Sequence, residues 1–253
     1  PIGSYKNLLP YLVRRLLENG ANSSFINRLL DPNTDSEWLA ENPFIRMDSE
    51  KKDIPLPKNI FKKRLNSSGM DISEKQNLDN LSHKLKSFEE KKVNAKSIYL
   101  GREKNNKNII NVDSISSGIN IGTVQYDNTK IIKSSLEENN SDEWSMTNVS
   151  KRSEILNKVA NLIEKDPHEL IFYLINEAGK TLQNAIDEIR EGVDFLRYYS
   201  EQAKEIIQEK DLDGPTGEDN KIYYNPKGRF LCISPWNFPV AILIGQISAA
   251  LAC

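Results

Sequence analysis

The feature that most constrains the fold is a long segment of helical periodicity from Thr181 to Glu209. Its apolar residues recur every three or four positions and so fall on one side of a helix. Together they form a continuous stripe, made up of Ala185, Ile189, Val193, Leu196 and Tyr199. The segment therefore predicts a long helix with one apolar face.

Further helices and short strands are predicted on both sides of this segment. Helical spacing also appears at residues 8–19, 152–164 and 167–176, and again from about Val240. Short β-branched runs between glycines predict strands within residues 98–132, and a second strand region is expected at 222–233. Residues 31–95 are interrupted by Pro32, Pro43, Pro55 and Pro57, and predict a connector with one helix near 73–92 that wraps a neighbouring surface. The pattern is that of an α/β protein.

Charge and hydropathy exclude several classes of protein. The formal net charge is −2, with 34 Lys+Arg against 36 Asp+Glu, which argues against a polybasic nucleic-acid binder. No apolar run reaches the roughly 20 residues of a membrane-spanning helix, and the first residues do not resemble a signal sequence. The default expectation is a cytoplasmic protein that binds no nucleic acid.

The cysteines and histidines suggest neither a disulfide framework nor a metal site. Two cysteines are too few to cross-link a secreted fold. Cys232 lies in an apolar run that predicts a buried, inert thiol, and Cys253 ends a helix. His83 and His168 are far apart and have no metal-ligand neighbours, so ordinary surface or capping roles are expected.

The helix at 8–19 carries a polar face that suggests anion binding. Tyr11, Arg14, Arg15 and Glu18 recur at helical spacing, and two guanidinium groups can hold one carboxylate through bidentate hydrogen bonds. Alternatively, the arginines are solvated or paired with Glu18.

The heptapeptide Ile233-Ser-Pro-Trp-Asn-Phe-Pro239 joins a predicted strand to a predicted helix. In α/β proteins such strand-to-helix loops bind nucleotides. The Asn237 amide, held between two prolines and bulky aromatics, can donate a hydrogen bond to an oxyanion that develops on an aldehyde carbon. Alternatively, the segment is a packed corner rich in proline and aromatic residues.

Residues 1–28 closely resemble the end of the proline dehydrogenase barrel in the bifunctional proline utilization A family. In that family the last barrel helix faces the FAD ring. The resemblance implies that Arg14 and Arg15 bind the proline carboxylate and that Tyr11 lines the pocket, with Glu18 able to orient an arginine. The segments 54–57 and 64–71 are similar to the part of the family that follows the barrel.

The heptapeptide 233–239 resembles the aldehyde dehydrogenase superfamily. The resemblance implies that Asn237 is the oxyanion donor and that Ile233, Ser234, Pro235 and Trp236 border the NAD site. Three further segments, 177–180, 185–199 and 214–220, point to Δ1-pyrroline-5-carboxylate dehydrogenases, which oxidise glutamate semialdehyde with NAD. Over residues 96–145 the resemblance rests on order and on Trp144 followed by Arg152.

These resemblances imply a segment from the junction of two catalytic modules. Residues 1–30 would be the end of the barrel, 31–95 the connector, and 96–253 the first, Rossmann-type part of the aldehyde dehydrogenase domain. The substrates would be proline and glutamate semialdehyde, and membrane association would be peripheral and only through the parent enzyme.

The family's nucleophilic Cys and general-base Glu would follow residue 253, so the chain is expected to be inactive alone. Two alternatives are a non-catalytic partner of a complementary fragment and a decayed gene product.

Overall fold

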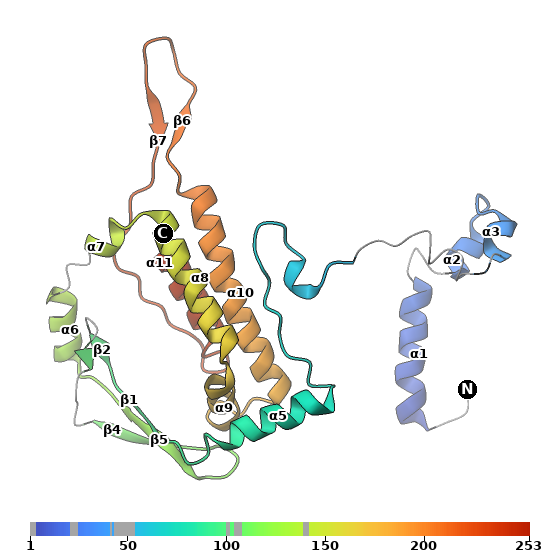
Figure 1. Ribbon diagram of the computed structural model, residues 1–253, viewed down its shortest axis with the longest axis horizontal. Coiled ribbons are helices and arrows are strands. Elements are labelled where there is room, and N and C mark those ends of the chain that lie inside the picture. Colours follow the sequence, from blue (N-terminus) through green and yellow to red (C-terminus); the bar gives the residue numbers. More distant parts are fainter. Residues whose placement is uncertain are drawn as a thin grey trace. The chain divides into compact units, whose positions relative to one another are not determined.

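The computed structural model describes residues 4–20, 25–40, 42, 54–99, 102–103, 108–138 and 142–253. The chain divides into two compact units, residues 1–54 and 55–253, and each is described by itself. Figure 1 shows the elements of both.

The first unit contains three helices in its described part. These are α1 (Tyr5–Gly20), α2 (Phe25–Leu30) and α3 (Ser36–Ala40). The predicted helix at 8–19 is confirmed and begins three residues earlier, and it stops at Gly20 as its sequence indicates. None of the side chains described in this unit is buried.

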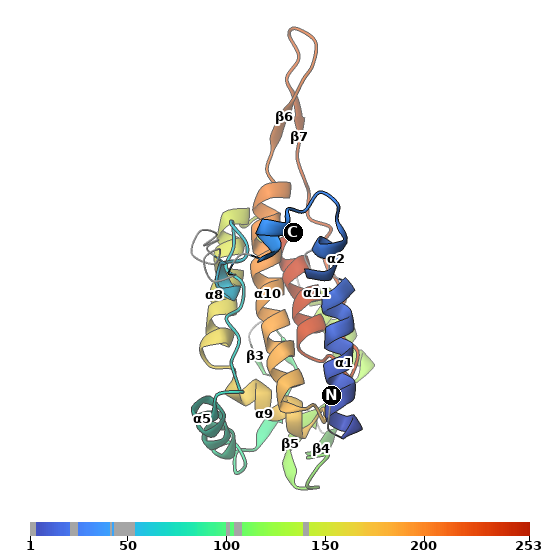
Figure 2. The same ribbon diagram turned by 90° about the vertical axis from the view of Figure 1, so that its right-hand side faces the viewer.

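The second unit is built around three helices that lie side by side, α8 (Val149–Lys165), α10 (Leu182–Ile206) and α11 (Ala241–Ala252), as Figures 1 and 2 show. The predicted stripe of α10 is confirmed, and its buried residues meet those of α8, of α11 and of α9 (His168–Asn176). Side-chain caps fix two helix starts: Asn148 accepts from the Ser150 N–H, and Thr181 accepts from the Asn184 N–H. These helices hold the core of the unit.

A small mixed sheet lies apart from the three helices in sequence and in space (Figure 1). Its strand order is β1 (Val93–Ala95), β5 (Asn120–Gln125), β4 (Ile109–Asp113), with β1 parallel and β4 antiparallel to β5. Gly122 of β5 is necessary, because a Cβ there would lie 2.1 Å from the Val93 carbonyl oxygen. Further elements of this region are β2 (Ile98–Tyr99), β3 (Arg102–Glu103), α6 (Thr129–Glu138) and α7 (Asp142–Ser145). The strands predicted within 98–132 are confirmed.

The connector contains η1 (Pro57–Asn59) and α5 (Lys75–Lys86). The helix expected near 73–92 is therefore shorter than predicted. It ends because the N–H groups of Ser87, Phe88 and Glu89 bond to carbonyls three residues back, which tightens the chain into turns.

The strand prediction at 222–233 is largely wrong. The hairpin β6 (Lys210–Leu212) and β7 (Asn220–Ile222) forms, and it extends beyond the end of α10 (Figure 2). Residues 229–233 are irregular, because a strand needs a partner for its backbone groups and no described residue supplies one. Cys232 is thus half-buried in an irregular segment and not buried in a strand, whereas Cys253 follows the last turn of α11 as expected.

Within the described residues, no helix is both long enough and apolar enough to span a membrane.

Candidate functional site

The loop that leads into α11 presents Asn237 to solvent. The Phe238 N–H donates to the Pro235 carbonyl at 3.2 Å, which closes a tight turn around Trp236 and Asn237. The Trp236 side chain is 83% exposed, so the aromatic packing expected of a buried corner is absent at this residue. In the described structure no residue forms a hydrogen bond with the Asn237 side chain, and its amide is available as a donor.

A buried ion pair contacts the end of this loop, where the chain enters α11. Lys180 Nζ lies 2.6 Å from Glu188 Oε2, and the two side chains are 11% and 1% exposed. The other carboxylate oxygen of Glu188 accepts the N–H groups of Val240 and Ala241 at 2.8 and 3.2 Å, at the start of α11. Lys180 Nζ also lies 4.3 Å from the centre of the Phe238 ring, a cation–π contact. One ion pair therefore contacts Phe238 and Val240 of the loop and Ala241, the first residue of α11.

Other contacts fix α11 itself. Gln246 donates to the Ile233 carbonyl at 2.9 Å, which anchors the beginning of the loop. At the opposite end of the helix, Trp144 Nε1 donates to the Leu251 carbonyl and Arg152 Nε donates to the Ala252 carbonyl, at 3.0 and 3.2 Å. Trp144 and Arg152, noted in the sequence only for their order, thus satisfy the last carbonyls of α11.

Sequence reasoning missed the part that Glu188 plays. The signal was present, because Glu188 is three residues after Ala185 and so shares the apolar face of the long helix. A carboxylate on a buried face needs hydrogen-bond or charged partners, so the position of Glu188 in the sequence already indicated that it contacts another segment.

The predicted anion-binding residues lie on α1, in the first unit. Tyr11, Arg14 and Arg15 are exposed, and the Arg15 guanidinium carbon is 5.5 Å from the centre of the Tyr11 ring. The shared face expected from the helical spacing is thus seen for Tyr11 and Arg15. Glu18 belongs to α1, but its side chain lies outside the described part of the structure.

The remaining titratable candidates do not form a metal centre. Among the described residues no group of three His, Cys, Asp or Glu side chains is arranged to hold a metal ion. His168 starts α9, is buried, and its Nδ1 lies 2.6 Å from Asp166 Oδ1. The hydrogen bond from His168 lowers the pKa of the Asp166 carboxyl below its ordinary value. His168 is thus a buried ring paired with Asp166, and because no side-chain hydrogen bond caps the start of α9, the expected surface or capping role is wrong.

The connector is bound to the helices along residues 66–70, which we call the strap. The Ser67 N–H and hydroxyl donate to the two Asp194 oxygens at 2.7 and 3.0 Å, and the Ser68 N–H donates to Glu164 at 2.8 Å. Arg197 donates to the second Glu164 oxygen at 2.6 Å. Burial acts to raise the pKa of Glu164, but the hydrogen bonds from Arg197 and Ser68 outweigh it and hold the pKa below 4.5. The prediction that the connector wraps a neighbouring surface is confirmed for the strap.

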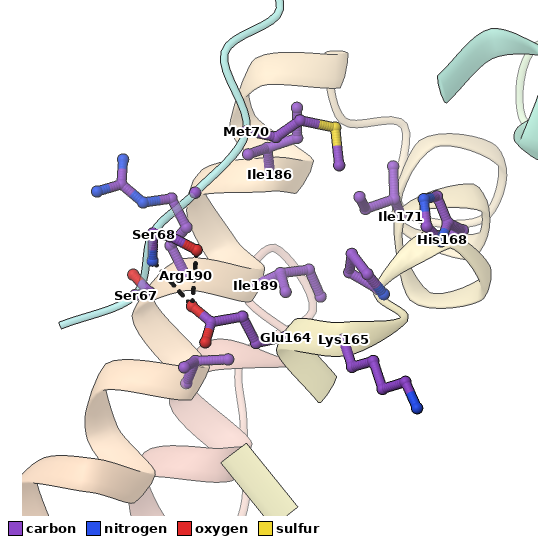
Figure 3. A pocket seen from close by; sticks show the side chains of 13 residues that line it. Ser67, Ser68, Met70, Glu164, Lys165, His168, Ile171, Ile186, Ile189 and Arg190 are labelled. Atoms are coloured by element: carbon purple, nitrogen blue, oxygen red, sulfur yellow. Dashed lines mark hydrogen bonds between the residues drawn. The ribbon is translucent and has the colours of Figure 1, made fainter. Parts of the chain in front are cut away.

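A cavity of about 130 Å³ lies between the strap and the helices (Figure 3). Apolar side chains of α9 and α10 line it, including Ile171, Ile186 and Ile189, and Met70 lines it from the strap. Glu164 at its edge is already engaged by Ser68, as the dashed lines in Figure 3 mark. The cavity therefore lies where the connector packs on the helices, and the Glu164 carboxylate at its edge is already paired.

Comparison with known proteins gives two family matches in one chain. The aldehyde dehydrogenase family model matches residues 102–253, and the proline dehydrogenase model matches residues 1–28. The bifunctional protein PutA of Salmonella typhimurium is 36% identical over 100% of this chain. This chain spans only 19% of the length of that protein.

Solved structures agree with these matches. The structure of proline utilization A from Bdellovibrio bacteriovorus inactivated by N-propargylglycine has a TM-score of 0.73 at 26% identity, over 100% of this chain and 26% of that one. The 1-pyrroline-5-carboxylate dehydrogenase from Thermus with bound NAD has a TM-score of 0.70 at 25% identity, over 76% of this chain and 38% of that one. The predicted α/β fold class, with an aldehyde dehydrogenase-like region, is confirmed. Because the family model covers more than half of its residues, the chain belongs to the aldehyde dehydrogenase family.

Proposed function

We propose that this chain supplies the carboxylate-binding helix and the oxyanion donor of an enzyme that oxidises proline to glutamate. The observation that carries the proposal is the match of PutA proteins to the whole chain, with proline dehydrogenase and aldehyde dehydrogenase matches in that order. We assign residues 1–30 to the end of the proline dehydrogenase module, 31–95 to a connector, and 96–253 to the start of the aldehyde dehydrogenase module. We assign the protein to the cytoplasm.

In the aldehyde dehydrogenase part, Asn237 would donate its side-chain N–H to the aldehyde oxygen of glutamate semialdehyde. That oxygen gains negative charge when a nucleophile adds to the carbon, so a fixed donor stabilises the transition state more than the substrate. The exposure and unpaired amide of Asn237 support this role.

The same loop would border NAD through Ile233, Ser234, Pro235 and Trp236. The exposed Trp236 ring and the exposed Ile233 side chain offer apolar surface to a planar ring, so these residues fit the cofactor. Bound NAD would accept the hydride that leaves the substrate carbon.

In the proline dehydrogenase part, Arg14 and Arg15 would hold the proline carboxylate and Tyr11 would line the pocket. Their exposure on one helix, with Arg15 over the Tyr11 ring, supports this assignment. Glu18 would orient one of the arginines. FAD is the expected electron acceptor of that half-reaction, but because no described side chain of the first unit is buried, these residues alone form no enclosed site for FAD and no step is assigned to it.

We further propose that the chain does not turn over alone and acts with a complementary segment. Its two cysteines are Cys232 and Cys253, and Cys253 is separated from Asn237 by the whole of α11, whose 12 residues span about 18 Å at 1.5 Å per residue. The alternative is that the chain is a remnant without activity in any combination.

The test is NADH formation from glutamate semialdehyde, run beside proline oxidation with added FAD. We expect no activity from the 253-residue chain alone and activity after addition of the polypeptide encoded directly downstream. Activity of the chain alone would overturn the proposed dependence, and inactivity in every combination would leave the remnant as the explanation.

Variants then test the assigned residues in the active combination. Asn237→Ala should lower kcat for the aldehyde by about 100-fold or more, which is typical for loss of one oxyanion donor. Asn225→Ala, an exposed Asn in the same unit, is the matched control and should leave kcat unchanged. Equal rates for the two variants would remove Asn237 from the mechanism.

A further inference from the structure

We propose that Glu188 is a positioning residue that sets where the Asn237 amide points, acting together with Lys180. This role rests on the proposed function of Asn237 as the oxyanion donor. Glu188 would touch neither substrate nor cofactor and would act only through the loop.

The first argument is the cost of placing a carboxylate where Glu188 lies. Its side chain is 1% exposed and stands on the face of α10 that also buries Ala185 and Ile189. A buried carboxylate is tolerated only when donors replace the water it has lost. An apolar residue of similar volume could fill the same space, so what this carboxylate adds is its hydrogen bonds and its ion pair.

The second argument is which groups contact its two oxygens. Lys180 Nζ lies 2.6 Å from one oxygen, and the N–H groups of Val240 and Ala241 lie 2.8 and 3.2 Å from the other. Both N–H groups belong to the start of α11, where a helix leaves its first donors unpaired. A single side chain thus joins the turn before α10 to the first residues of α11.

The third argument links these contacts to Asn237. Val240 is three residues after Asn237, and consecutive Cα atoms are 3.8 Å apart, so the loop has little slack between them. Phe238, the residue directly after Asn237, has the centre of its ring 4.3 Å from Lys180 Nζ. The Glu188–Lys180 pair therefore holds the backbone and one side chain directly after the proposed donor.

A small displacement would matter because an oxyanion donor has to lie about 2.7–3.1 Å from the charged oxygen. The exposed Asn237 side chain has no hydrogen bond of its own to a described residue. Its orientation depends on the backbone that carries it.

Two tryptophans at opposite ends of α11 provide the test. Trp236 is in the loop, and Trp144 is bonded to the Leu251 carbonyl at the other end. In the full chain labelled with 5-fluorotryptophan, the ¹⁹F signals are assigned with Trp236→Phe and Trp144→Phe. Hydrogen exchange at the amides of Val240 and Ala241 is measured in the same samples.

We expect Glu188→Ala to shift or broaden the Trp236 signal, to leave the Trp144 signal in place, and to speed exchange at Val240 and Ala241 by about tenfold or more. This magnitude follows from the loss of hydrogen bonds to a charged acceptor. Glu191→Ala, an exposed Glu on the same helix, is the matched control and should change neither readout.

Glu188→Gln combined with Lys180→Met should restore much of the protection at Val240 and Ala241. The amide oxygen can still accept both N–H groups, and no charge is left buried without its partner. If Glu188→Ala does not fold, the exchange rates at Val240 and Ala241 are compared between this double variant and Lys180→Met alone.

An unchanged Trp236 signal and unchanged exchange in Glu188→Ala would overturn the proposal. Equal changes at Trp236 and Trp144 would also overturn it, because they would show a general effect on α11. These readouts do not depend on catalysis. If Asn237→Ala proves active, the function proposed for Asn237 fails, while the control of the loop by Glu188 is still decided.

Discussion

Helices α1 and α10 have the same kind of sequence pattern and very different environments. Both carry apolar residues at helical spacing, and both are helical over the predicted ranges. In α10 the stripe is buried, with Leu196 4% exposed, whereas Leu17 of α1 is 72% exposed. Periodicity therefore predicts that a helix forms and which face is apolar, but burial requires a partner that the pattern does not contain.

The polar groups show the same contrast. Arg152, Glu188 and Arg197 of the second unit are buried, and each has a hydrogen bond or an ion pair with another segment. The arginines of α1 are exposed on their helix. The buried charges of the second unit join elements together, whereas the arginines of α1 lie on the surface of their helix.

The largest expected effect is that of a cavity in the covered helix. Leu196→Ala should lower the free energy of unfolding by about 2–5 kcal/mol, because the methyl groups removed leave a space that the core cannot fill. Leu17→Ala in α1 should cost less than about 0.5 kcal/mol. Urea unfolding followed by circular dichroism measures both, and similar losses for the two variants would show that burial does not distinguish the two helices.

The second largest loss of stability is expected for Arg152, a buried arginine of α8 whose side chain bonds to the end of α11. Arg152→Met removes the donors to the carbonyls of Ala252 and Thr147 and should cost about 1.5–3 kcal/mol. Lys151→Met changes the neighbouring exposed residue, whose ion pair with Glu154 is on the surface, and should cost under about 0.5 kcal/mol. Thermal unfolding of the two variants would contradict this account if their midpoints were equal.

The attachment of the strap should weaken when its acceptor, Asp194, is removed. Asp194→Ala leaves the buried N–H and hydroxyl of Ser67 without a partner and should cost about 1–2 kcal/mol. We expect faster proteolysis within residues 63–70 and unchanged amide exchange in α8. Glu191→Ala is the control, and an equal cleavage rate in the two variants would show that the strap does not depend on Asp194.

The smallest effect is a pH dependence at Glu164. Because its pKa in the folded protein lies below 4.5, its contribution to stability is complete above that pH and is lost as the pH falls through the folded pKa. Partial exposure to solvent keeps the contribution under about 1 kcal/mol. Glu164→Gln should flatten this part of the stability curve between about pH 5 and 3, and coincident curves for the two proteins would refute the assignment.

Much of the fold could be predicted from local patterns. The helices at 8–19, 152–164, 167–176 and 181–209 formed because apolar spacing and caps such as Thr181 act within a few residues of the chain. The run at 229–233 has the composition of a strand but is irregular, since strand formation depends on a distant partner.

The candidate site divides in the same way. Asn237 could be predicted from the loop sequence around it, because the prolines and Asn237 itself indicate a turn that carries a hydrogen-bond donor. Glu188 and Lys180 were not assigned a role, because their contacts to Val240, Ala241 and Phe238 join residues more than fifty positions apart. Rules based on residue spacing predict contacts within one element and cannot predict contacts between residues so far apart in the sequence.

The helices, the α/β class and the residues proposed to bind and react could be predicted from the sequence, since they depend on local geometry and on side-chain chemistry. Three features could be seen only in the folded chain: the buried ion pair that contacts the Asn237 loop, the hydrogen bonds of Trp144 and Arg152 to the end of α11, and the bonds of the strap to Glu164 and Asp194. The physical reason is that a buried charge is stable only beside its partners, and those partners are brought together by packing of segments far apart in the chain.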